Sequence, residues 1–594
     1  MSNAIALLSA TVDELASSID AVWILVGAAL VFFMQAGFAI VEAGLTRAKN
    51  TGNILMKNLM DFCLGTIVFW ILGYGLMHGR DVGGVIGTPT ADFITGDNDM
   101  LHLIFQTVFC ATAATIVSGA MAERTKFSCY CIYSVVISLV IYPVSGHWIW
   151  GGGWLAQMGF HDFAGSTAVH MVGGICALVG AAFLGPRIGK YGKDGKDGKP
   201  RAIPGHNLTF AALGVFILWF CWFGFNGAST YGAVGQEGTM ALVFVTTNMA
   251  PAVAATTCMI ITWIRYKKPD VSMCLNGALA GLVAITASCD MVTPLGAAII
   301  GIFAGFIVVF GVELLDKKLK IDDPVGAIAV HCFCGAAGTI FTGIFSATDG
   351  LWAAAAGTVT WGQGFYFFGV QLLGFVAVAA WVTATITLTF CLLKKFMGLR
   401  VSAKEEIAGL DSCEHNLASA YAGFDFTDNT SDEYLADHPE LMHEASAPSV
   451  AKVTAPAAPS TPAAYVSART SNEKTPKLTK VAMVISRDRF EPLKTALNAI
   501  GVTGITVTDV MGCGTQKGRT AMYRGTEYEI TLLPKCKVEV VVSAVPVQTV
   551  VETAEKVLRT GNFGDGKIFV YDVENVIRVR TGEEGFDALQ DAND

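Results

Sequence analysis

The sequence predicts an all-α polytopic membrane protein with 11 transmembrane helices, followed by a small α+β domain of the ferredoxin-like type. Two features of composition predict the membrane part: 53% of the 594 residues are hydrophobic and only 15% are charged. Soluble chains carry about 25% charged residues. Short alternating strands and amphipathic helices after residue 476 predict the second part. The formal net charge of −9 argues against a nucleic-acid partner.

Eleven stretches are long and apolar enough to cross a bilayer, which takes about 20 helical residues. They are residues 22–45, 54–77, 101–121, 126–148, 165–185, 208–228, 240–264, 274–289, 293–314, 326–346 and 366–393. Basic residues gather in alternate connections, which stay in the cytoplasm. These connections hold Arg47 and Lys49; Arg124 and Lys126; the run from Arg187 to Arg201; Arg265, Lys267 and Lys268; and Lys317, Lys318 and Lys320. The alternation predicts an outer N-terminus and an inner C-terminus. We expect no cleaved signal peptide, because no basic region precedes the first apolar run.

The segment DFAGSTAVHMVGG places Asp162 and His170 eight residues apart at the start of the fifth stretch. Ionisable groups at membrane depth cost ~2.5–3.5 kcal/mol on insertion scales, so they are functional candidates. The helical repeat puts both residues on broadly one face, with His170 about 12 Å deeper. Asp162 is consistent with a helix cap alone or with a cap that also binds a cation. His170 by itself is equally consistent with a core histidine.

A second histidine repeats the pattern of the first. The triplet AVH ends at His170 in the fifth stretch and at His331 in the tenth, and a GF pair ends at Phe38 in the first and Phe225 in the sixth. Stretches 1–5 and 6–10 are therefore predicted to be two copies of one unit, followed by one extra helix. Because five crossings is an odd number, the second copy must be inverted. Inverted repeats place a site near the bilayer midplane, where the two histidines would face each other.

Two facing imidazoles in a dry pore cannot both be charged cheaply, because desolvation and like charge lower each pKa. They suit a small neutral molecule or a hopping proton, and they do not suit K⁺. No nucleophile accompanies either histidine, so we do not expect an enzyme. Phe109, Trp150, Phe225 and Ser229 add an aromatic cation site at the outer mouth, or for Trp150 simply an interfacial belt. The 15 cysteines complete no zinc pattern, and no metal site is expected.

Six longer motifs connect these residues: VEAGLTRAKN, GAMAERTKF, WGGGWL, DFAGSTAVH, WFGFNGAS and DDPVGAIAVH. Over about residues 20–425 the chain resembles the ammonium transporter (Amt/Mep/Rh) family. The resemblance implies that Asp162 polarises an outer NH₄⁺ site. It also implies roles for the other candidates: Phe109, Trp150 and Ser229 line that site, Phe109 and Phe225 form a stacked gate, and His170 and His331 are paired pore histidines.

The resemblance further implies a homotrimer with one pore per subunit. It places the protein in the bacterial cytoplasmic (inner) membrane, where its outer surface contacts membrane lipid. Ammonium would lose its proton at the outer site and ammonia would pass along the histidines, with the proton following. The alternative is an ammonium sensor with little flux. We divide the chain into a membrane domain (1–395), a cytoplasmic tail (396–427), a disordered linker rich in Ala, Pro, Ser and Thr (428–475), and a regulatory domain (476–594).

The last domain is predicted from its order of elements. VAMVIS, ITVTDVMG, YEITLL, KVEVVVSAV and KIFVYDV are expected to be strands, and RFEPLKTALNAIG and PVQTVVETAEKVLRTG helices. Four of these strands and the two helices can be ordered β-α-β-β-α-β, which predicts a ferredoxin-like module. The motifs MGCGTQKGRTAMYRGTEYE, LLPKCKVEV, TGNFGDGKIFV and VIRVRTGE resemble the P-II signal-transduction proteins.

The P-II resemblance implies an ATP or ADP site. It would be formed by Thr506, Thr508, Gly512, Gly514, Gln516, Gly564, Asp565, Gly566, Lys567, Arg578 and Arg580. Gln516 and Lys535 would help to hold 2-oxoglutarate with Mg²⁺. The departures Thr515, Ser486 and Arg487 leave the identity of the nucleotide and effector open. Residues 517–531 resemble a T-loop, with Arg524 at its tip and Tyr528 as a modification site or plain loop residue. This loop would block the cytoplasmic mouth of the pore within the same molecule.

Overall fold

The computed structural model describes residues 2–89, 96, 99–191, 199–417, 420–421, 477–486, 489–512, 519–523, 526–530, 533–559 and 565–589. The chain divides into two compact units, one before residue 448 and one built from most of the residues after it. The predicted linker, residues 428–475, lies outside the described residues.

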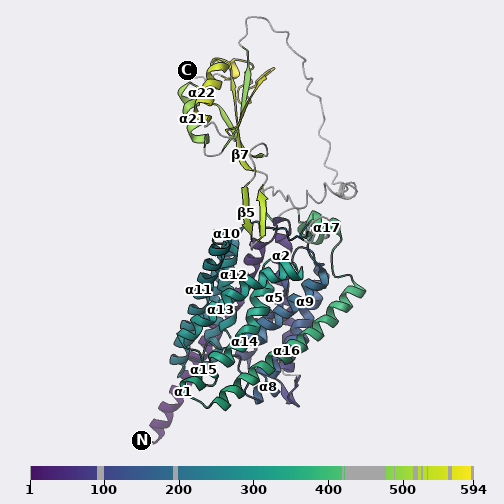
Figure 1. Cartoon of the computed structure of the whole chain (residues 1–594), viewed down its shortest axis with the longest axis vertical. Helices are drawn as coiled ribbons and strands as arrows, with labels where there is room; N and C mark the ends of the chain where they lie inside the picture. Colours follow the sequence, from purple (N-terminus) through teal and green to yellow (C-terminus); the bar gives the residue numbers. More distant parts are fainter. Residues whose placement is uncertain are drawn as a thin grey trace. The chain divides into compact units, whose positions relative to one another are not determined.

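The first unit is a bundle of long apolar helices packed side by side (Figure 1). Its α-helices are α1 (Ser2–Leu45), α2 (Thr51–Val68), α3 (Tyr74–His78), α5 (Met100–Ala120), α6 (Phe127–Val136), α7 (Tyr142–Ile149), α8 (Trp154–Gln157), α9 (Val172–Leu184), α10 (Leu208–Gly227), α11 (Glu237–Tyr266), α12 (Val271–Ile285), α13 (Pro294–Glu313), α14 (Cys334–Phe345), α15 (Leu351–Ala356), α16 (Trp361–Phe396), α17 (Ala403–Ala408) and α18 (Leu410–His415). Wider π-helical turns continue some of them: η2 (Phe69–Gly73), η3 (Ile137–Ile141), η4 (Ser166–Met171), η7 (Leu314–Leu319) and η8 (Ile328–Phe333). A short hairpin, β1 (Arg80–Val82) and β2 (Ile86–Thr88), follows α3.

Within the described residues, 10 helical stretches are long and apolar enough to cross a membrane, and each coincides with a predicted span. The remaining predicted span, residues 274–289, contains helix α12, which has 15 residues and ends at Ile285. That length gives about 22 Å of rise, less than the ~30 Å of a hydrocarbon core. The chain is therefore a polytopic helical membrane protein, and the total of 11 crossings stays a prediction.

The two histidine-bearing helices begin in the same way. Residues 162–170 and 323–331 share the pattern D-x-x-G-x-x-A-V-H. The carboxylate of Asp162 accepts the N–H groups of Gly165, Thr167 and Ala168 at 2.8–2.9 Å. The carboxylate of Asp323 accepts the corresponding N–H groups of Gly326 and Ile328 at 2.9 and 2.7 Å. Each aspartate thus satisfies backbone donors that a helix start leaves without partners.

A glycine in the left-handed region completes each start. Gly165 has φ 109° and Gly326 has φ 84°, values that residues with a Cβ rarely adopt. A π-helical turn follows in both copies and carries the histidine, as η4 and η8. Single π-turns inside helices are rare and recur at functional sites. The likeness of the two copies therefore extends from sequence to backbone conformation.

Glycines let the two histidine-bearing segments touch through their main chains. A Cβ on Gly174 of α9 would lie 2.2 Å from the backbone nitrogen of Cys332. A Cβ on Gly335 of α14 would lie 2.8 Å from the carbonyl oxygen of Ser166. Neither distance is compatible with a real side chain, so these glycines set how closely the segments approach.

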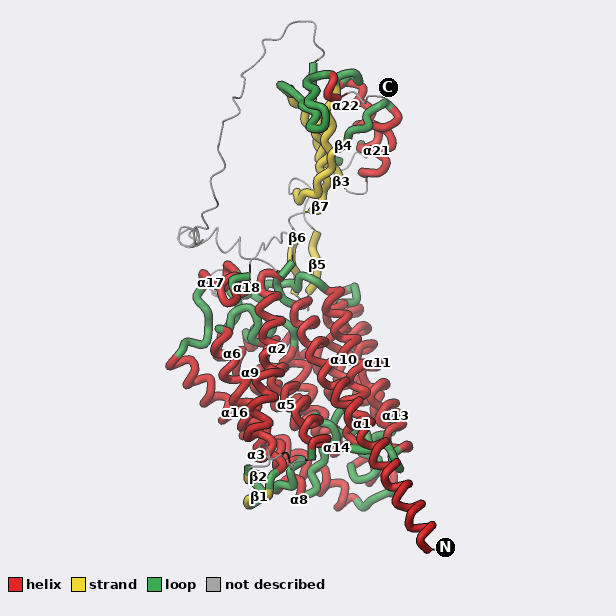
Figure 2. The backbone as a smooth tube through the Cα atoms, turned by 180° about the vertical axis from the view of Figure 1, so that it is seen from behind, coloured by secondary structure: helices red, strands yellow, loops and turns green. Residues whose placement is uncertain are grey.

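The second unit has the predicted ferredoxin-like topology. Its elements are β3 (Thr479–Ser486), α21 (Phe490–Ala499), β4 (Ile505–Gly512), β7 (Leu533–Val542), α22 (Val547–Leu558) and β8 (Lys567–Asp572). The sheet order is β4-β7-β3-β8, and every neighbouring pair is antiparallel. Both helices lie on one face of the sheet (Figures 1 and 2). Alternate residues Val481, Met483 and Ile485 are buried there with Leu493 and Val550.

The predicted strand YEITLL falls on two strands, and residues 531 and 532 between them lie outside the described residues. Its first residues lie in β6 (Thr526–Ile530), which pairs with β5 (Arg519–Tyr523) in a separate two-stranded sheet, while Leu533 begins β7. An apolar alternation shows that a segment is extended, but it does not show which partner strand receives its hydrogen bonds.

Candidate functional site

The two AVH histidines lie against each other inside the bundle. His170 Nδ1 and His331 Nδ1 are 3.3 Å apart, and their rings lie 5.2 Å apart at 30°. His170 is completely buried and His331 is 4% exposed. At this distance one Nδ1 donates a hydrogen and the other accepts it. The pair therefore carries one proton between the rings and leaves both Nε2 atoms for other partners.

His170 is fixed by aromatic rings on α10. Trp222 stacks on it at 5.0 Å and 23°, and Phe225 stacks at 5.5 Å and 26°. The Trp222 Nε1–H donates to Thr286 Oγ1 at 2.9 Å, which holds the indole in place. His170 Nε2 is buried and has no hydrogen-bond partner among the described residues. An unsatisfied buried nitrogen of this kind marks a place where a small polar guest would gain a hydrogen bond.

The predicted gate and outer-site residues lie together beside His170. Phe109 of α5 and Phe225 of α10 stack with ring centroids 4.1 Å apart at 21°. Trp150 meets Phe109 edge-on at 6.1 Å. Ser229 Oγ donates its hydrogen to the Phe225 carbonyl at 2.9 Å, which leaves its lone pairs as acceptors. Aromatic faces and an acceptor oxygen form a site suited to a small N–H cation.

Asp162 adjoins this site as a buried cap. Both of its carboxylate oxygens accept backbone N–H groups, and Trp150 Nε1–H donates to its carbonyl oxygen at 2.7 Å. Burial raises the pKa of Asp162 above its ordinary value, and the backbone donors oppose that rise. Of the two interpretations of Asp162, the structure shows the cap directly. A cation role would act chiefly through its charge, since three backbone N–H groups already donate to its oxygens.

A cavity adjoins His331, and neither Phe109 nor Phe225 is among its lining residues. It has about 350 Å³ of atom-free space, including solvent at its opening. Its lining is mostly aliphatic and comes from α1, α5, α12 and the segment that begins η8: Phe38, Val41, Glu42, Ile116, Gly119, Asn276, Leu279, Val325, Ala327, Val330 and His331. The phenyl rings, the histidines and this cavity thus follow one another through the bundle.

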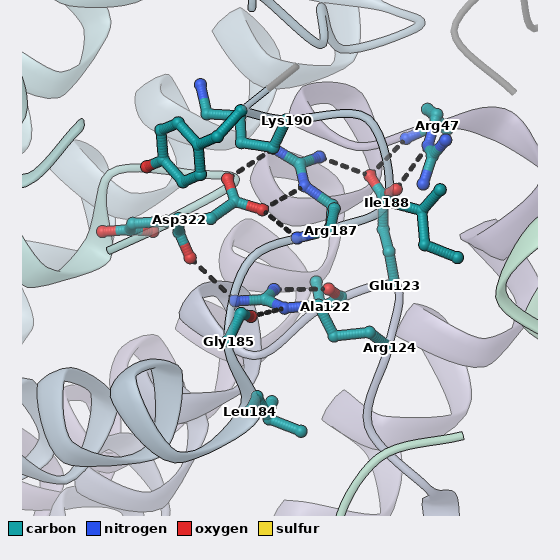
Figure 3. Close-up of polar contacts among 12 residues, drawn as sticks. Arg47, Ala122, Glu123, Arg124, Leu184, Gly185, Arg187, Ile188, Lys190 and Asp322 are labelled. Atoms are coloured by element: carbon teal, nitrogen blue, oxygen red, sulfur yellow. Dashed lines mark hydrogen bonds and ion pairs between the residues drawn. The ribbon is translucent and has the colours of Figure 1, made fainter. Parts of the chain in front are cut away.

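A buried ion network joins the loops that the sequence predicts to be cytoplasmic. Figure 3 shows Arg187 between two carboxylates: it reaches Glu123 at 2.9 Å and Asp322 at 2.8 Å. Arg47 binds Glu123 from the other side at 2.5 Å. Burial alone would raise the pKa of Glu123, but the guanidinium groups of Arg47 and Arg187 outweigh burial and lower this pKa to about 2. Arg124 donates to the carbonyl oxygens of Ala122, Gly185 and Asp322. Arg47, Arg124 and Arg187 are therefore structural anchors between these loops.

The segment after α16 packs onto these loops. Glu406 of α17 accepts the Ile188 N–H at 2.7 Å and pairs with Arg400 at 2.7 Å. Asp411 of α18 accepts the N–H groups of Gly52 and Asn53. The tail thus contacts the first turn of α2 and the connection after α9.

The predicted nucleotide residues are only partly described. Thr506 and Thr508 are exposed on β4, which ends at Gly512, and Asp565, Gly566 and Lys567 lead into β8. Gly566 has φ 111°, and Arg578 pairs with Glu583 at 2.8 Å while Arg580 is exposed. Lys535 on β7 pairs in register with Ser486 on β3 and donates to its hydroxyl at 3.1 Å. Gly514, Thr515, Gln516, Gly564, Arg487 and Arg524 lie outside the described residues, as does the side chain of Tyr528.

Sequence reasoning missed Trp222 and a group of buried charges near the cavity, Glu42, Lys57 and Asp61. An aromatic residue in an apolar span carries no signal, so Trp222 could not have been found. Lys57 and Asp61, four residues apart in a predicted span, were a usable signal, because ionisable residues inside membrane helices are rare.

An apolar helical bundle that encloses paired imidazoles, a phenyl stack and a cavity in series defines a helical membrane transporter. The sequence model of the Ammonium Transporter Family matches residues 22–421, and this chain belongs to that family. The model of Nitrogen regulatory protein P-II matches residues 478–583, so the second unit is a P-II domain. Both resemblances inferred from the motifs are confirmed.

Relatives and solved structures agree with this assignment. Ammonium transporter Amt2 of Archaeoglobus fulgidus is 50% identical over 427 residues, covering 68% of this chain and 89% of that one. Ammonium transporter 3 of Dictyostelium discoideum is 36% identical over 409 residues, covering 68% and 94%. The structure named Sensor Amt Protein is 38% identical, with a TM-score of 0.63 and coverage of 68% and 100%. Mep2 of Candida albicans is 29% identical, with a TM-score of 0.57 and coverage of 65% and 86%.

Proposed function

We propose that this protein moves ammonium into the cell by separating it into NH₃ and H⁺ at an outer site and passing both along His170 and His331. The observation that carries the proposal is the imidazole pair, 3.3 Å apart beneath the phenyl stack. Such a pair can relay one proton at a time and can hydrogen-bond a small amine. It cannot stabilise a permanent cation cheaply.

The mechanism uses the groups in series. Ammonium loses water against Trp150 and Phe109, where cation–π attraction is worth ~0.5–2 kcal/mol and Ser229 Oγ accepts an N–H. The nearby negative charge of Asp162 favours the cation until its proton leaves. Ammonia then passes the phenyl rings to His170 Nε2, and the proton follows through the shared Nδ1 contact. K⁺ cannot give up a proton, so it would bear the full desolvation penalty.

The finer architecture belongs to the same proposal. We infer 11 crossings in two inverted repeats plus one helix, an outer N-terminus, a cytoplasmic P-II domain, and a homotrimer in a bacterial inner membrane. The alternation of basic loops supports the orientation, and the repeated D-x-x-G-x-x-A-V-H start supports the two repeats.

The proposal also includes regulation of the pore by the P-II domain of the same chain. The P-II domain would bind ATP or ADP, and a T-loop with Arg524 and Tyr528 would block the inner mouth of the pore. The described residues fit phosphate: Gly566 provides a left-handed turn, and exposed Lys567 and Arg580 provide positive charge. Lys535 would contribute to a 2-oxoglutarate and Mg²⁺ site.

Ammonium-induced current in proteoliposomes tests the proposal. His170→Ala and His331→Ala should each lower the current by about tenfold or more, or admit K⁺, since acid–base groups contribute two or more orders of magnitude. His415→Ala, a tail histidine that bonds Asn53, is the matched control. Wild-type currents from both pore variants would reject the histidine pathway.

The second candidate function is an ammonium sensor that signals through its P-II domain. Two observations favour it: the fused regulatory domain and the 38% identity to the structure named Sensor Amt Protein. A sensor would bind ammonium without sustained current, so the wild-type current in the same experiment decides between the two.

A further inference from the structure

Glu42, Lys57 and Asp61 lie inside the first two membrane helices and have no part in the mechanism above. They are 3%, 1% and 0% exposed. Buried ionisable groups at membrane depth are costly and need a compensating role. Of the three, Glu42 alone lines the cavity that begins at His331.

The two oxygens of the Glu42 carboxylate have different surroundings. Oε2 accepts the Ser118 hydroxyl at 2.6 Å and the Asn58 amide at 3.3 Å. Oε1 accepts no hydrogen bond from the described residues. It is also not one of the fully buried side-chain atoms that lack a hydrogen-bond partner. One oxygen is therefore anchored to α5 and α2, and the other receives no hydrogen bond from the described residues, on a side chain that lines the cavity.

Lys57 is a nearby positive charge that favours a negative charge on Glu42. Its ammonium group donates to the Ser118 carbonyl oxygen at 3.2 Å and lies 5.0 Å from the Tyr130 ring centre. Asp61 accepts hydrogen bonds from Ser134, at 2.5 Å, and from Tyr130. Ser118 thus connects the cation and the carboxylate through its two oxygens, and the cation stays out of the cavity.

The described lining of the cavity offers no rival proton acceptor. Glu42 and His331 are the two lining residues whose side chains can take up a proton, and the rest are aliphatic, aromatic, glycine or Asn276. The space suffices for water, which can bridge groups that are not in direct contact.

We infer that Glu42 is the proton acceptor at the inner end of the conduit, a role that rests on the proposed transport function. An N–H bond of the protonated imidazole pair breaks at His331, and cavity water carries the proton to Glu42 Oε1. The pair returns to neutral and the carboxylate becomes a carboxylic acid. That acid then gives its proton to departing NH₃, which leaves as NH₄⁺ and restores the carboxylate.

Glu42→Gln in the full-length protein tests this role, because glutamine keeps the volume and an acceptor oxygen but cannot take up the proton. Ammonium-induced current in proteoliposomes should fall by about tenfold or more. Glu42→Asp should restore much of it. Glu237→Gln, the same chemical change at an exposed position, should match wild type.

Chemical rescue shows whether the Glu42 carboxylate transfers a proton or only anchors the surrounding helices. Formate inside the vesicles should raise the current of Glu42→Ala in a dose-dependent way, because a small carboxylate can occupy the space and carry the proton. Wild-type current from Glu42→Gln would overturn the inference, and so would a loss that neither aspartate nor formate restores. Absence of current from the wild type itself would instead reject the transport function.

Discussion

Arg187 is the residue on which the buried ion network depends. It contacts two carboxylates that are themselves almost fully buried, Glu123 and Asp322. Removing one partner of a buried ion pair typically costs about 3–5 kcal/mol, because the remaining charge is left without compensation. We expect Arg187→Ala to lower the thermal unfolding temperature of the purified protein strongly.

Lys317→Ala is the control for that substitution. Lys317 pairs with Glu313 at 3.2 Å on a half-exposed surface, where an ion pair is worth about 0–1 kcal/mol. Its unfolding temperature should stay near that of wild type. Equal melting of wild type and Arg187→Ala would show that the network contributes nothing to stability.

His161 and Asp290 form a pair next to the outer site, at 3.0 Å. Burial opposes protonation of His161, but the Asp290 carboxylate outweighs it and raises the histidine pKa above its ordinary value of 6.5. The pair therefore stabilises the fold fully below pH 6.5, and its contribution is lost as the pH rises through the raised pKa. The stability difference between wild type and Asp290→Asn should be largest in mild acid and small in alkali. A difference that grows with pH would contradict this sign.

The candidate site was predictable where rare side chains repeat. An ionisable residue in an apolar stretch stands out, and the second AVH made the His170–His331 pair predictable from the residues alone. Trp222 was not found, because its importance arises from contacts between helices far apart in the chain. Lys57 and Asp61 did carry a signal, as ionisable residues in an apolar stretch, but their contact with Glu42 on another helix could not be seen in it. Sequence periodicity reports which face of a helix is polar, and it does not report what that face meets.

At the scale of elements, Gly174 controls the contact between α9 and η8. Alanine there would place its Cβ 2.2 Å from a backbone nitrogen that cannot move independently. Overpacking of this kind costs about 1–3 kcal/mol, and here it would also shift a histidine. Gly174→Ala should lower both the unfolding temperature and the ammonium current.

Gly369→Ala is the matched control within helix α16, because nothing lies within 4 Å of its added Cβ. Alanine is the better helix former by about 1 kcal/mol, so stability should hold or rise. If both variants melted alike, the close approach of the main chains would not limit stability.

The helices were predictable as elements because twenty apolar residues in a row have few alternatives. The local backbone conformation within these helices was not predictable. The left-handed glycines and π-turns before each histidine follow from packing and capping, and a hydropathy pattern contains neither. Helix α12 shows the same limit, since its apolar composition suggested a full span and its helix stops after 15 residues.

For the whole molecule, the central prediction concerns removal of residues 476–594. If the P-II domain regulates transport in cis, wild-type current should change with ATP, ADP and 2-oxoglutarate, and the truncated protein should ignore all three. The measurement is ammonium-induced current, titrated with each ligand on the side that carries the domain. Identical responses from both proteins would remove regulation in cis while leaving transport intact.

The main-chain contact at Gly174 and Gly335 also bears on redesign. Where two backbones touch, the spacing of the two histidine-bearing segments is a property of the fold, and exchanging side chains there offers no graded adjustment. Variants intended to admit methylated amines should therefore start from the rings of Phe109 and Phe225, whose size can be trimmed in steps. Substitutions at Phe109 and Phe225 would then change which molecules fit, while His170 and His331 would continue to handle the proton.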